Sequence, residues 1–188
     1  MQCMKVYAPV SWMLIALFLA CTRPGGGTDY ESNLGDTVLT AAPKAPITII
    51  TGSTTPAEVT DFAKTLNGIP YKYASINPAD GFDCSGFITY VFNHFGISVP
   101  RSSVDFTTVQ REVKEKEAKP GDLVLFTGTD STTHIVGHMG IVLHNGPAGF
   151  IFIHSTSGRA NGVTETLLND DYQHRYVKTV RVFPQNDQ

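Results

Sequence analysis

Apolar residues recur at helical spacing in two segments of the chain. In residues 55–66, a capping sequence Thr-Pro-Ala-Glu precedes apolar positions that follow one another at intervals of three and four residues. Residues 84–95 carry a second apolar stripe, which ends at Gly96. These patterns predict two amphipathic helices, and residues 102–111 are compatible with a third, short helix.

In the second half of the chain the pattern changes from helical to alternating. Apolar stretches with the composition of strands cover residues 123–126, 138–144 and 150–154, and residues 176–183 alternate again. The turn-forming residues 145–149 join the second and third stretches into a hairpin. Helices first and strands afterwards indicate an α+β domain with a mainly antiparallel sheet.

The first 20 residues have the pattern of an export signal. Lys5 supplies the positive charge of a short n-region, and residues 10–20 form an uncharged, mostly apolar run that is too short to span a bilayer. The run ends in Phe-Leu-Ala before Cys21, which resembles the lipobox of bacterial lipoproteins. This resemblance predicts lipidation of Cys21, and plain secretion with cleavage nearby is the alternative.

The segment that follows, residues 21–52, has the composition of a flexible tether. Gly, Pro, Ser and Thr make up about half of it, so it buries too little apolar surface to fold alone. Within it, residues 47–51 are compatible with a short strand that docks on the domain. The predicted organisation is therefore a signal peptide over residues 1–20, a lipid-anchored tether over 21–52 and one domain over 53–188.

Composition and charge narrow the class of protein. With 188 residues, of which 41% are hydrophobic, the chain has enough apolar material for one core, and this excludes wholesale disorder. The formal net charge is -3, so we expect no basic surface that could hold nucleic acid. No internal repeat or second domain is visible, and we expect a monomer.

Cysteine usage singles out one residue. Cys3 leaves with the signal peptide and Cys21 is expected to carry lipid, so Cys84 is the free thiol of an exported protein. Its polar neighbours Asp83 and Ser85 favour a reactive thiol over an inert core residue. The start of a helix stabilises a thiolate and lowers the pKa of the thiol, although the negative charge of Asp83 opposes this effect.

Two histidines flank the predicted hairpin. If its turn is centred near residue 146 or 147, His154 lies opposite His138 or Gly140, and both imidazoles then project from the same face of the sheet. A thiol that faces two such histidines is the arrangement of an activated nucleophile, in which His138 takes the proton and His154 orients the ring. A register slip of one residue would separate the two rings.

A series of short motifs resembles the NlpC-type cell-wall cysteine peptidases, which have a papain-like core in permuted order. The resemblance covers residues 55–183 and rests on seven segments: Ile69-Pro70-Tyr71, Gly-Phe-Asp-Cys-Ser-Gly-Phe over 81–87, Gly96-Ile97, Val99-Pro100-Arg101-Ser102, Pro-Gly-Asp-Leu-Val-Leu-Phe over 120–126, His-Met-Gly-Ile-Val-Leu over 138–143, and Phe-Ile-His-Ser-Thr over 152–156. It implies helices packed on an antiparallel sheet. It also implies that Cys84 is the nucleophile, His138 the general base and His154 the third polar member, with the Tyr71 hydroxyl near the thiol and the oxyanion.

The resemblance implies a function as well. Such enzymes hydrolyse amide bonds in peptidoglycan stem peptides through a cysteine thioester, commonly at the link between D-glutamate and a diamino acid, with no cofactor and no metal. Asp83, Ser85, Arg101 and Ser155 are the candidates for binding the substrate, and the polar residues 155–161 and Arg101 suit its carboxylates. We accordingly expect an exported lipoprotein that is anchored in a membrane through Cys21 and faces the cell wall.

The sequence also departs from the family pattern and is compatible with further hypotheses. Residues 73–75 read Tyr-Ala-Ser where the family often has a bulky aromatic residue and two glycines, and an extra His134 precedes His138. A metal site is conceivable, although zinc motifs pair their ligands at short spacings that Cys84 lacks; its ligands would be Cys84, His138, His144 and His154. Two more hypotheses are a hydrolase or acyltransferase that acts on a non-cell-wall amide, and a catalytically silent cell-wall-binding lipoprotein.

Overall fold

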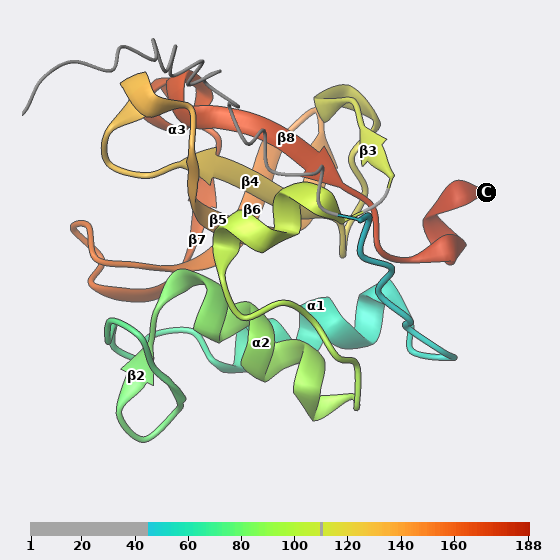
Figure 1. Cartoon of the computed structure of the whole chain (residues 1–188), viewed down its shortest axis with the longest axis horizontal. Helices are drawn as coiled ribbons and strands as arrows, with labels where there is room; N and C mark the ends of the chain where they lie inside the picture. Colours follow the sequence, from blue (N-terminus) through green and yellow to red (C-terminus); the bar gives the residue numbers. More distant parts are fainter. Residues whose placement is uncertain (1–44, 110) are drawn as a thin grey trace, which may run out of the picture. The chain divides into compact units, whose positions relative to one another are not determined.

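The structure is a computed structural model that describes residues 45–109 and 111–188 (Figure 1). The predicted signal peptide, the proposed lipidation site Cys21 and the predicted tether up to residue 44 lie outside the described residues. None of the helices within the described ranges combines the length and hydropathy needed to cross a membrane.

Three α-helices and a six-stranded antiparallel sheet form the body of the domain over the described residues. The helices are α1 (Pro56–Thr65), α2 (Cys84–His94) and a short α3 (Asp170–Arg175). The sheet has the order β3-β8-β4-β5-β6-β7, and its strands are β3 (Glu112–Val113), β4 (Leu123–Thr127), β5 (Val136–Gly146), β6 (Gly149–Thr156), β7 (Gly162–Leu167) and β8 (Tyr176–Val180). A small second sheet pairs β1 (Ile76–Asn77) with β2 (Gly81–Phe82), and 3-10 helices cover Ser103–Thr108, Glu115–Glu117, Ser131–Thr133 and Pro184–Asp187.

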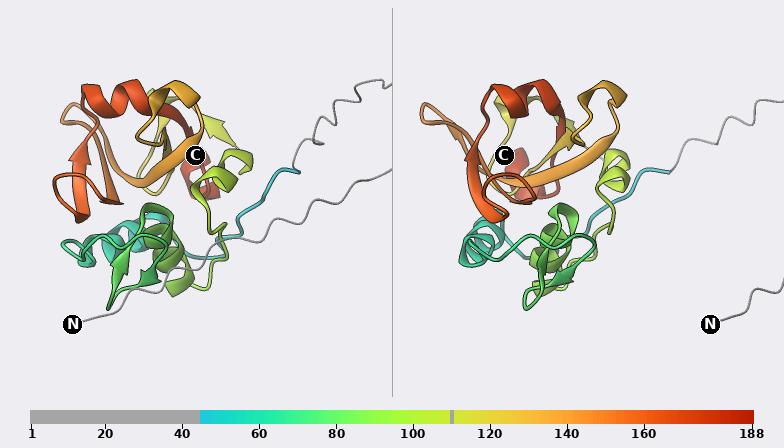
Figure 2. Two further views of the ribbon diagram at one scale, coloured as in Figure 1. Left: turned by 60° about the vertical axis from the view of Figure 1, so that its left-hand side comes forward. Right: turned by 90° about the vertical axis from the view of Figure 1, so that its left-hand side faces the viewer.

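The sheet is covered on both faces, as Figures 1 and 2 show. Helices α1 and α2 pack on one face, where Leu123 and Leu125 of β4 join the larger hydrophobic core. Val124 and Phe126 alternate to the other face and form a smaller core, against which Tyr172 of α3 packs. The predicted α+β class, with helices packed on a mainly antiparallel sheet, is confirmed.

The sequence predictions agree with the structure in most elements and differ in a few. The capping box of α1 is present, because Thr55 accepts from the backbone of Glu58 and the Glu58 carboxylate accepts in return. The expected third helix is a 3-10 helix over Ser103–Thr108. Strand β7 and helix α3 were not predicted, since their mostly polar sequences carry little apolar periodicity.

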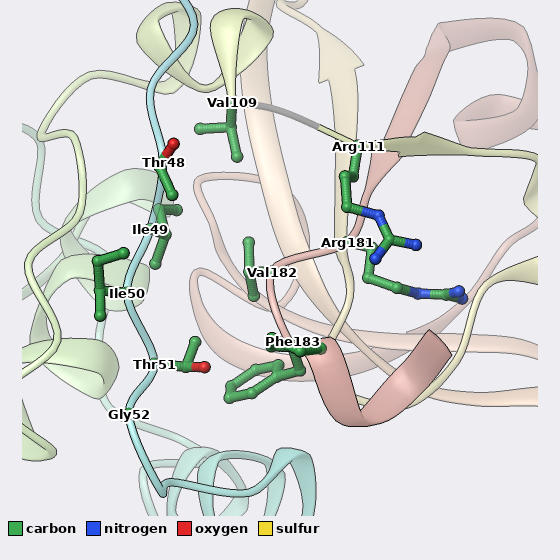
Figure 3. A pocket seen from close by; sticks show the side chains of 11 residues that line it. Thr48, Ile49, Ile50, Thr51, Gly52, Val109, Arg111, Arg181, Val182 and Phe183 are labelled. Atoms are coloured by element: carbon green, nitrogen blue, oxygen red, sulfur yellow. The ribbon is translucent and has the colours of Figure 1, made fainter. Parts of the chain in front are cut away.

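The N-terminal end of the described chain packs on the domain without forming the strand expected over residues 47–51. Ile47 makes a single bridge to Val109, and Ile49 is a buried member of the larger core. A separate cavity of about 220 Å³ lies between residues 48–52 and the segment 181–184 that follows β8 (Figure 3). Packed structure therefore begins before Ser53, the predicted start of the domain.

The Pro-Gly-Asp motif at residues 120–122 has a structural role beside this cavity. Asp122 is fully buried, and its carboxylate pairs with the guanidinium of Arg181 at 3.1 Å and accepts from the Asn186 amide at 3.1 Å. The same carboxylate accepts from the backbone N–H of Lys119, which closes the turn before β4. This network fixes the start of β4 against the C-terminal segment.

Candidate active site

The loop before α2 and the first turn of that helix fit together closely. Asp83 is the N-cap, and its carboxylate accepts from the backbone N–H of Gly86. A Cβ atom at Gly86 would lie only 2.0 Å from the carbonyl oxygen of Ser75, so only glycine lets the loop approach the helix. The Asp-Cys-Ser-Gly sequence thus places Cys84 as the first residue of α2, where it lines a cavity together with Tyr71.

A β-bulge sets the parity of the two histidines. Gly146 pairs with Gly149, and this register alone would put the two imidazoles on opposite faces of the sheet. A shift between Val142 and His144 adds one residue to β5, and beyond it Val142 pairs with Phe152. The corrected register places His154 opposite Gly140 and diagonal to His138, so the predicted shared face is confirmed, with the help of a bulge that was not predicted.

The two histidines are in direct contact. Nε2 of His138 lies 2.7 Å from Nδ1 of His154, and Nε2 of His154 lies 2.9 Å from Oγ1 of Thr166 on β7. The rings meet edge to face at 82°. This contact engages Nε2 of His138 and not Nδ1, and Cys84 lines the same cavity as His138.

Only one set of tautomers allows His138 to act as a base. If Nδ1 of His138 is unprotonated, its Nε2–H donates to Nδ1 of His154, and the Nε2–H of His154 then donates to the Thr166 hydroxyl. Thr166 therefore ends the chain as an acceptor. Nothing in the sequence pointed to this threonine, because it reaches the site from an unpredicted strand.

Burial keeps both imidazoles neutral. It lowers the pKa of His138 well below its ordinary value of 6.5, and the neighbouring His154 and Arg175 add to this effect. For His154, burial and the charge of Arg175 lower the pKa to about 3. An uncharged His138 can accept a proton, as a general base requires.

The pKa of the Cys84 thiol differs from the sequence-based expectation. Burial and the negative charge of Asp83 raise the pKa of Cys84 above its ordinary value, and the backbone N–H groups of Ser85, Cys84 and Met139 only partly oppose this. The thiol lies 3.7 Å from the carbonyl oxygen of Gly137, which accepts its proton. The predicted lowering of the thiol pKa by the helix start is thus wrong, because desolvation and the charge of Asp83 outweigh the effect of the helix.

Three of the predicted substrate-binding residues form one network beside the thiol. The Arg101 guanidinium binds the Asp83 carboxylate through two bonds, of 3.1 and 2.7 Å, and donates to the Ser85 hydroxyl at 2.9 Å. The Arg101 side chain remains 43% exposed, whereas that of Asp83 is 10% exposed. All three residues line a cavity of about 480 Å³, together with Tyr71, Tyr73, Ala74, Cys84, Ser102, Ser103 and Gly137.

Ser155 does not join this network. It is fully buried, and its hydroxyl donates to the carbonyl of Phe82 at 2.7 Å, which ties β6 to β2. The prediction that it contacts substrate is therefore corrected, since strand alternation turns its side chain into the interior. The residues after it, Thr156 and Ser157, line a cavity instead.

That second cavity, of about 570 Å³, lies on the histidine side of the thiol. Its lining comprises Tyr71, Cys84, Gly128, Thr129, Gly137, His138, Thr156, Ser157, Gly158, Asp171, Tyr172 and Arg175. This cavity shares Tyr71, Cys84 and Gly137 with the cavity lined by Arg101, so the Cys84 thiol lies where the two cavities meet. The Tyr71 pKa is raised by burial and by the nearby Cys84 and Asp83, which keeps its hydroxyl protonated and able to donate.

Tyr172 of helix α3 packs against both histidine rings. The Tyr172 ring lies 6.0 Å from that of His138 and 5.4 Å from that of His154. The guanidinium of Arg175 lies 5.3 Å from the centre of the Tyr172 ring. These two residues were also missed from the sequence, because α3 has only six residues and no apolar stripe.

The remaining histidines lie elsewhere. His134 is exposed in the loop before β5, His144 is exposed beyond the bulge, and His174 is exposed on α3. His94 stacks on Phe62 with ring centres 3.7 Å apart. Among residues 45–109 and 111–188, no group of three or more His, Cys, Asp or Glu side chains is arranged to hold a metal ion.

Comparisons with known proteins identify the family of the chain. The model of the NlpC/P60 family matches residues 68–182. The chain is 34% identical over 132 residues to the gamma-DL-glutamyl hydrolase of Bacillus subtilis, covering 70% of this chain and 30% of that protein. It is 42% identical over 79 residues to the bifunctional muramidase/DL-endopeptidase CwlT of the same species, covering 42% of this chain and 24% of that protein.

A solved structure shows the same fold. The NlpC/P60 family protein from Bacillus cereus is 28% identical, with a TM-score of 0.62, and the match covers 71% of this chain and 42% of that one. The chain therefore spans less than a third of the two curated relatives and under half of this structure. With a family model that matches more than half of its length, and with the fold in agreement, the chain belongs to the NlpC/P60 family.

Proposed function

We propose that the chain is a cysteine endopeptidase that hydrolyses the amide bond between D-glutamate and a diamino acid in peptidoglycan stem peptides. The observation that carries the proposal is the line of hydrogen bonds from His138 through His154 to Thr166, which leaves one imidazole nitrogen for the thiol of Cys84. The relatives named as a gamma-DL-glutamyl hydrolase and a DL-endopeptidase support the bond and the substrate class.

The first half of the reaction forms a thioester. The Cys84 sulfur attacks the carbonyl carbon of the scissile amide while its proton passes to Nδ1 of His138. The backbone N–H of Cys84 at the start of α2, together with the Tyr71 hydroxyl, stabilises the resulting oxyanion, and one such donor is worth about 3 kcal/mol. His138 then gives its proton to the leaving nitrogen, and the C–N bond breaks to release the amine.

The second half of the reaction hydrolyses the thioester. His138 takes a proton from a water molecule as the water oxygen attacks the acyl carbon, and the C–S bond breaks to release the carboxylic acid. The proton returns from His138 to the Cys84 sulfur. In both halves, the neutral His154 accepts the Nε2–H of His138 and stabilises the ring while it is charged.

The acyl part of the substrate is assigned to the cavity beside α2. Arg101 holds Asp83 along one edge of its guanidinium and remains partly exposed, so it presents a cation to a substrate carboxylate. Asp83 and Ser85 fix that cation next to the thiol. The exposed Tyr73 ring borders the same cavity and offers an apolar contact.

The proposal includes the place of action. The Phe-Leu-Ala-Cys junction supports lipidation of Cys21, and the Gly- and Pro-rich segment after it supports a tether between the lipid and the domain. An exported, membrane-anchored monomer would then meet peptidoglycan at the distance that the tether allows.

The proposal is tested by mass spectrometry of purified peptidoglycan fragments after incubation with the chain and with its Cys84→Ala variant. The expected result is a new amino terminus on the diamino acid with the unsubstituted chain and none with the variant. Intact fragments in the presence of a thiol that still reacts with iodoacetamide would contradict the proposal and favour another amide as the substrate. Cleavage by both proteins would show that Cys84 is not the nucleophile.

A further inference from the structure

The two cavities that meet at Cys84 are not equivalent. His138 lines the second cavity and is absent from the lining of the first. A general acid must lie next to the atom that it protonates, and His138 protonates the leaving amine. The second cavity is therefore where the leaving group binds, and the first holds the acyl part.

The wall of this leaving-group cavity carries two opposite charges on one face of α3. Asp171 and Arg175 are separated by four positions, which places them on the same side of the helix, and both line the cavity. Neither takes part in any ion pair within residues 45–109 and 111–188. Both charges are thus available to a ligand.

Arg175 is held in place without being neutralised. One of its terminal N–H groups donates to the backbone carbonyl of Thr127 at 2.8 Å, and its guanidinium lies over the Tyr172 ring. Its Nε and the Thr127 hydroxyl are the buried side-chain polar atoms of the described chain that lack a hydrogen-bond partner. A guanidinium that is oriented but uncompensated is suited to bind a carboxylate.

We propose that Arg175 and Asp171 bind the zwitterionic end of a diaminopimelate residue, Arg175 its carboxylate and Asp171 its ammonium group. This inference rests on the proposed function and narrows its substrate. Lysine at the same position of a stem peptide has the ammonium group but lacks the distal carboxylate, so Arg175 discriminates between the two. Amidation of the distal carboxylate removes the same contact.

The test measures binding without cleavage. Three tripeptides, L-Ala–γ-D-Glu followed by meso-diaminopimelate, by L-lysine or by distally amidated diaminopimelate, are titrated by calorimetry into the Cys84→Ala variant. A hydrogen bond to a charged group is worth about 1.5–3 kcal/mol, so we expect the diaminopimelate peptide to bind roughly 10- to 150-fold more tightly than the other two. The α-carboxylate next to the scissile nitrogen is common to all three and cancels.

Second substitutions assign the effect to particular residues. Arg175→Gln is expected to bring the affinity ratio close to one, Arg175→Lys to retain part of it, and Lys64→Gln, an exposed cation on α1, to leave it unchanged. Asp171→Asn is expected to weaken binding of the diaminopimelate and lysine peptides alike, since both carry the distal ammonium group. Each result is the ratio of two peptide affinities measured on the same variant. An effect of Arg175 on the histidines changes both affinities alike and cancels in that ratio.

Failure of the inference and failure of the proposed function give different results. Equal affinity for the diaminopimelate and lysine peptides, or a ratio that survives Arg175→Gln, overturns the inference even if the unsubstituted chain cleaves both. If Arg175→Gln does not fold, the amidated peptide and Arg175→Lys still decide. If the chain neither binds nor cleaves any of the three, the proposed function fails and the inference fails with it.

Discussion

Replacing Thr166 by valine tests whether the end of the hydrogen-bond chain sets the tautomer of the base. Valine keeps the β-branched shape and removes the oxygen that lies 2.9 Å from Nε2 of His154. His154 is fully buried, so its N–H then has no partner, which costs about 1–3 kcal/mol. The ring can avoid this cost only by moving its proton to Nδ1, where it faces Nε2 of His138.

That second tautomer disables the base. With a proton on Nδ1, His154 becomes the donor, and His138 must accept at Nε2 and carry its own proton on Nδ1, where the thiol proton should arrive. Either response raises the barrier by about 1–3 kcal/mol, so kcat/KM should fall by roughly 5- to 150-fold. Thr166→Ser restores the oxygen and should recover most of the activity.

The assay combines kinetics with a direct view of the protons. The kcat/KM for a cleaved stem peptide is measured for both variants, and nitrogen-15 spectra of labelled histidine report the tautomers of His138 and His154. Thermal unfolding serves as the control for a purely structural loss. Wild-type activity in Thr166→Val, or equal losses in the valine and serine variants, would refute the tautomer argument.

Three further predictions concern charge and anchoring. Burial lowers the pKa of His138 and His154 in the folded chain, so the unfolded state binds more protons than the folded state below about pH 6.5. The free energy of unfolding should therefore fall with decreasing pH, by about 1.4 kcal/mol per pH unit for each histidine. Urea unfolding at pH 5 to 7 measures this slope, which should be smaller in His154→Gln. Asp83→Asn removes a negative charge beside Cys84 and should lower the thiol pKa, measured by the pH dependence of iodoacetamide alkylation; an unchanged or higher midpoint would contradict this. Cys21→Ser should release the protein from the membrane fraction or leave its precursor uncleaved, whereas unchanged processing and association would argue against the lipobox.

The sequence was informative where local rules decide the structure. The cap of α1 and the strand composition of β4, β5 and β6 depend on neighbouring residues, and their predictions agree with the structure. The sequence also predicts the shared face of the two histidines, but from a turn centred at residue 146 or 147, whereas the turn is centred between residues 147 and 148. A bulge in β5 compensates for this difference in register, and no residue pattern predicts the bulge.

Contacts between distant elements were not predictable in the same way. Thr166 and Arg175 reach the site from β7 and α3, whose short polar sequences resemble loops. Ser155 is a candidate in the sequence because it follows His154, yet its alternate position on the strand buries it against Phe82. The elevated thiol pKa likewise depends on tertiary burial, which the helix start alone does not reveal.

The central claim is that Cys84 forms a thioester with the acyl part of the stem peptide and that His138 is its base. The most direct measurement is intact-mass spectrometry of the chain after rapid mixing with the diaminopimelate tripeptide and acid quenching. We predict an added mass equal to the L-Ala–D-Glu acyl group, mapped to Cys84 by digestion, present in His134→Ala and absent in His138→Ala. An adduct on another residue, or one that persists in His138→Ala and disappears in His134→Ala, would contradict the account.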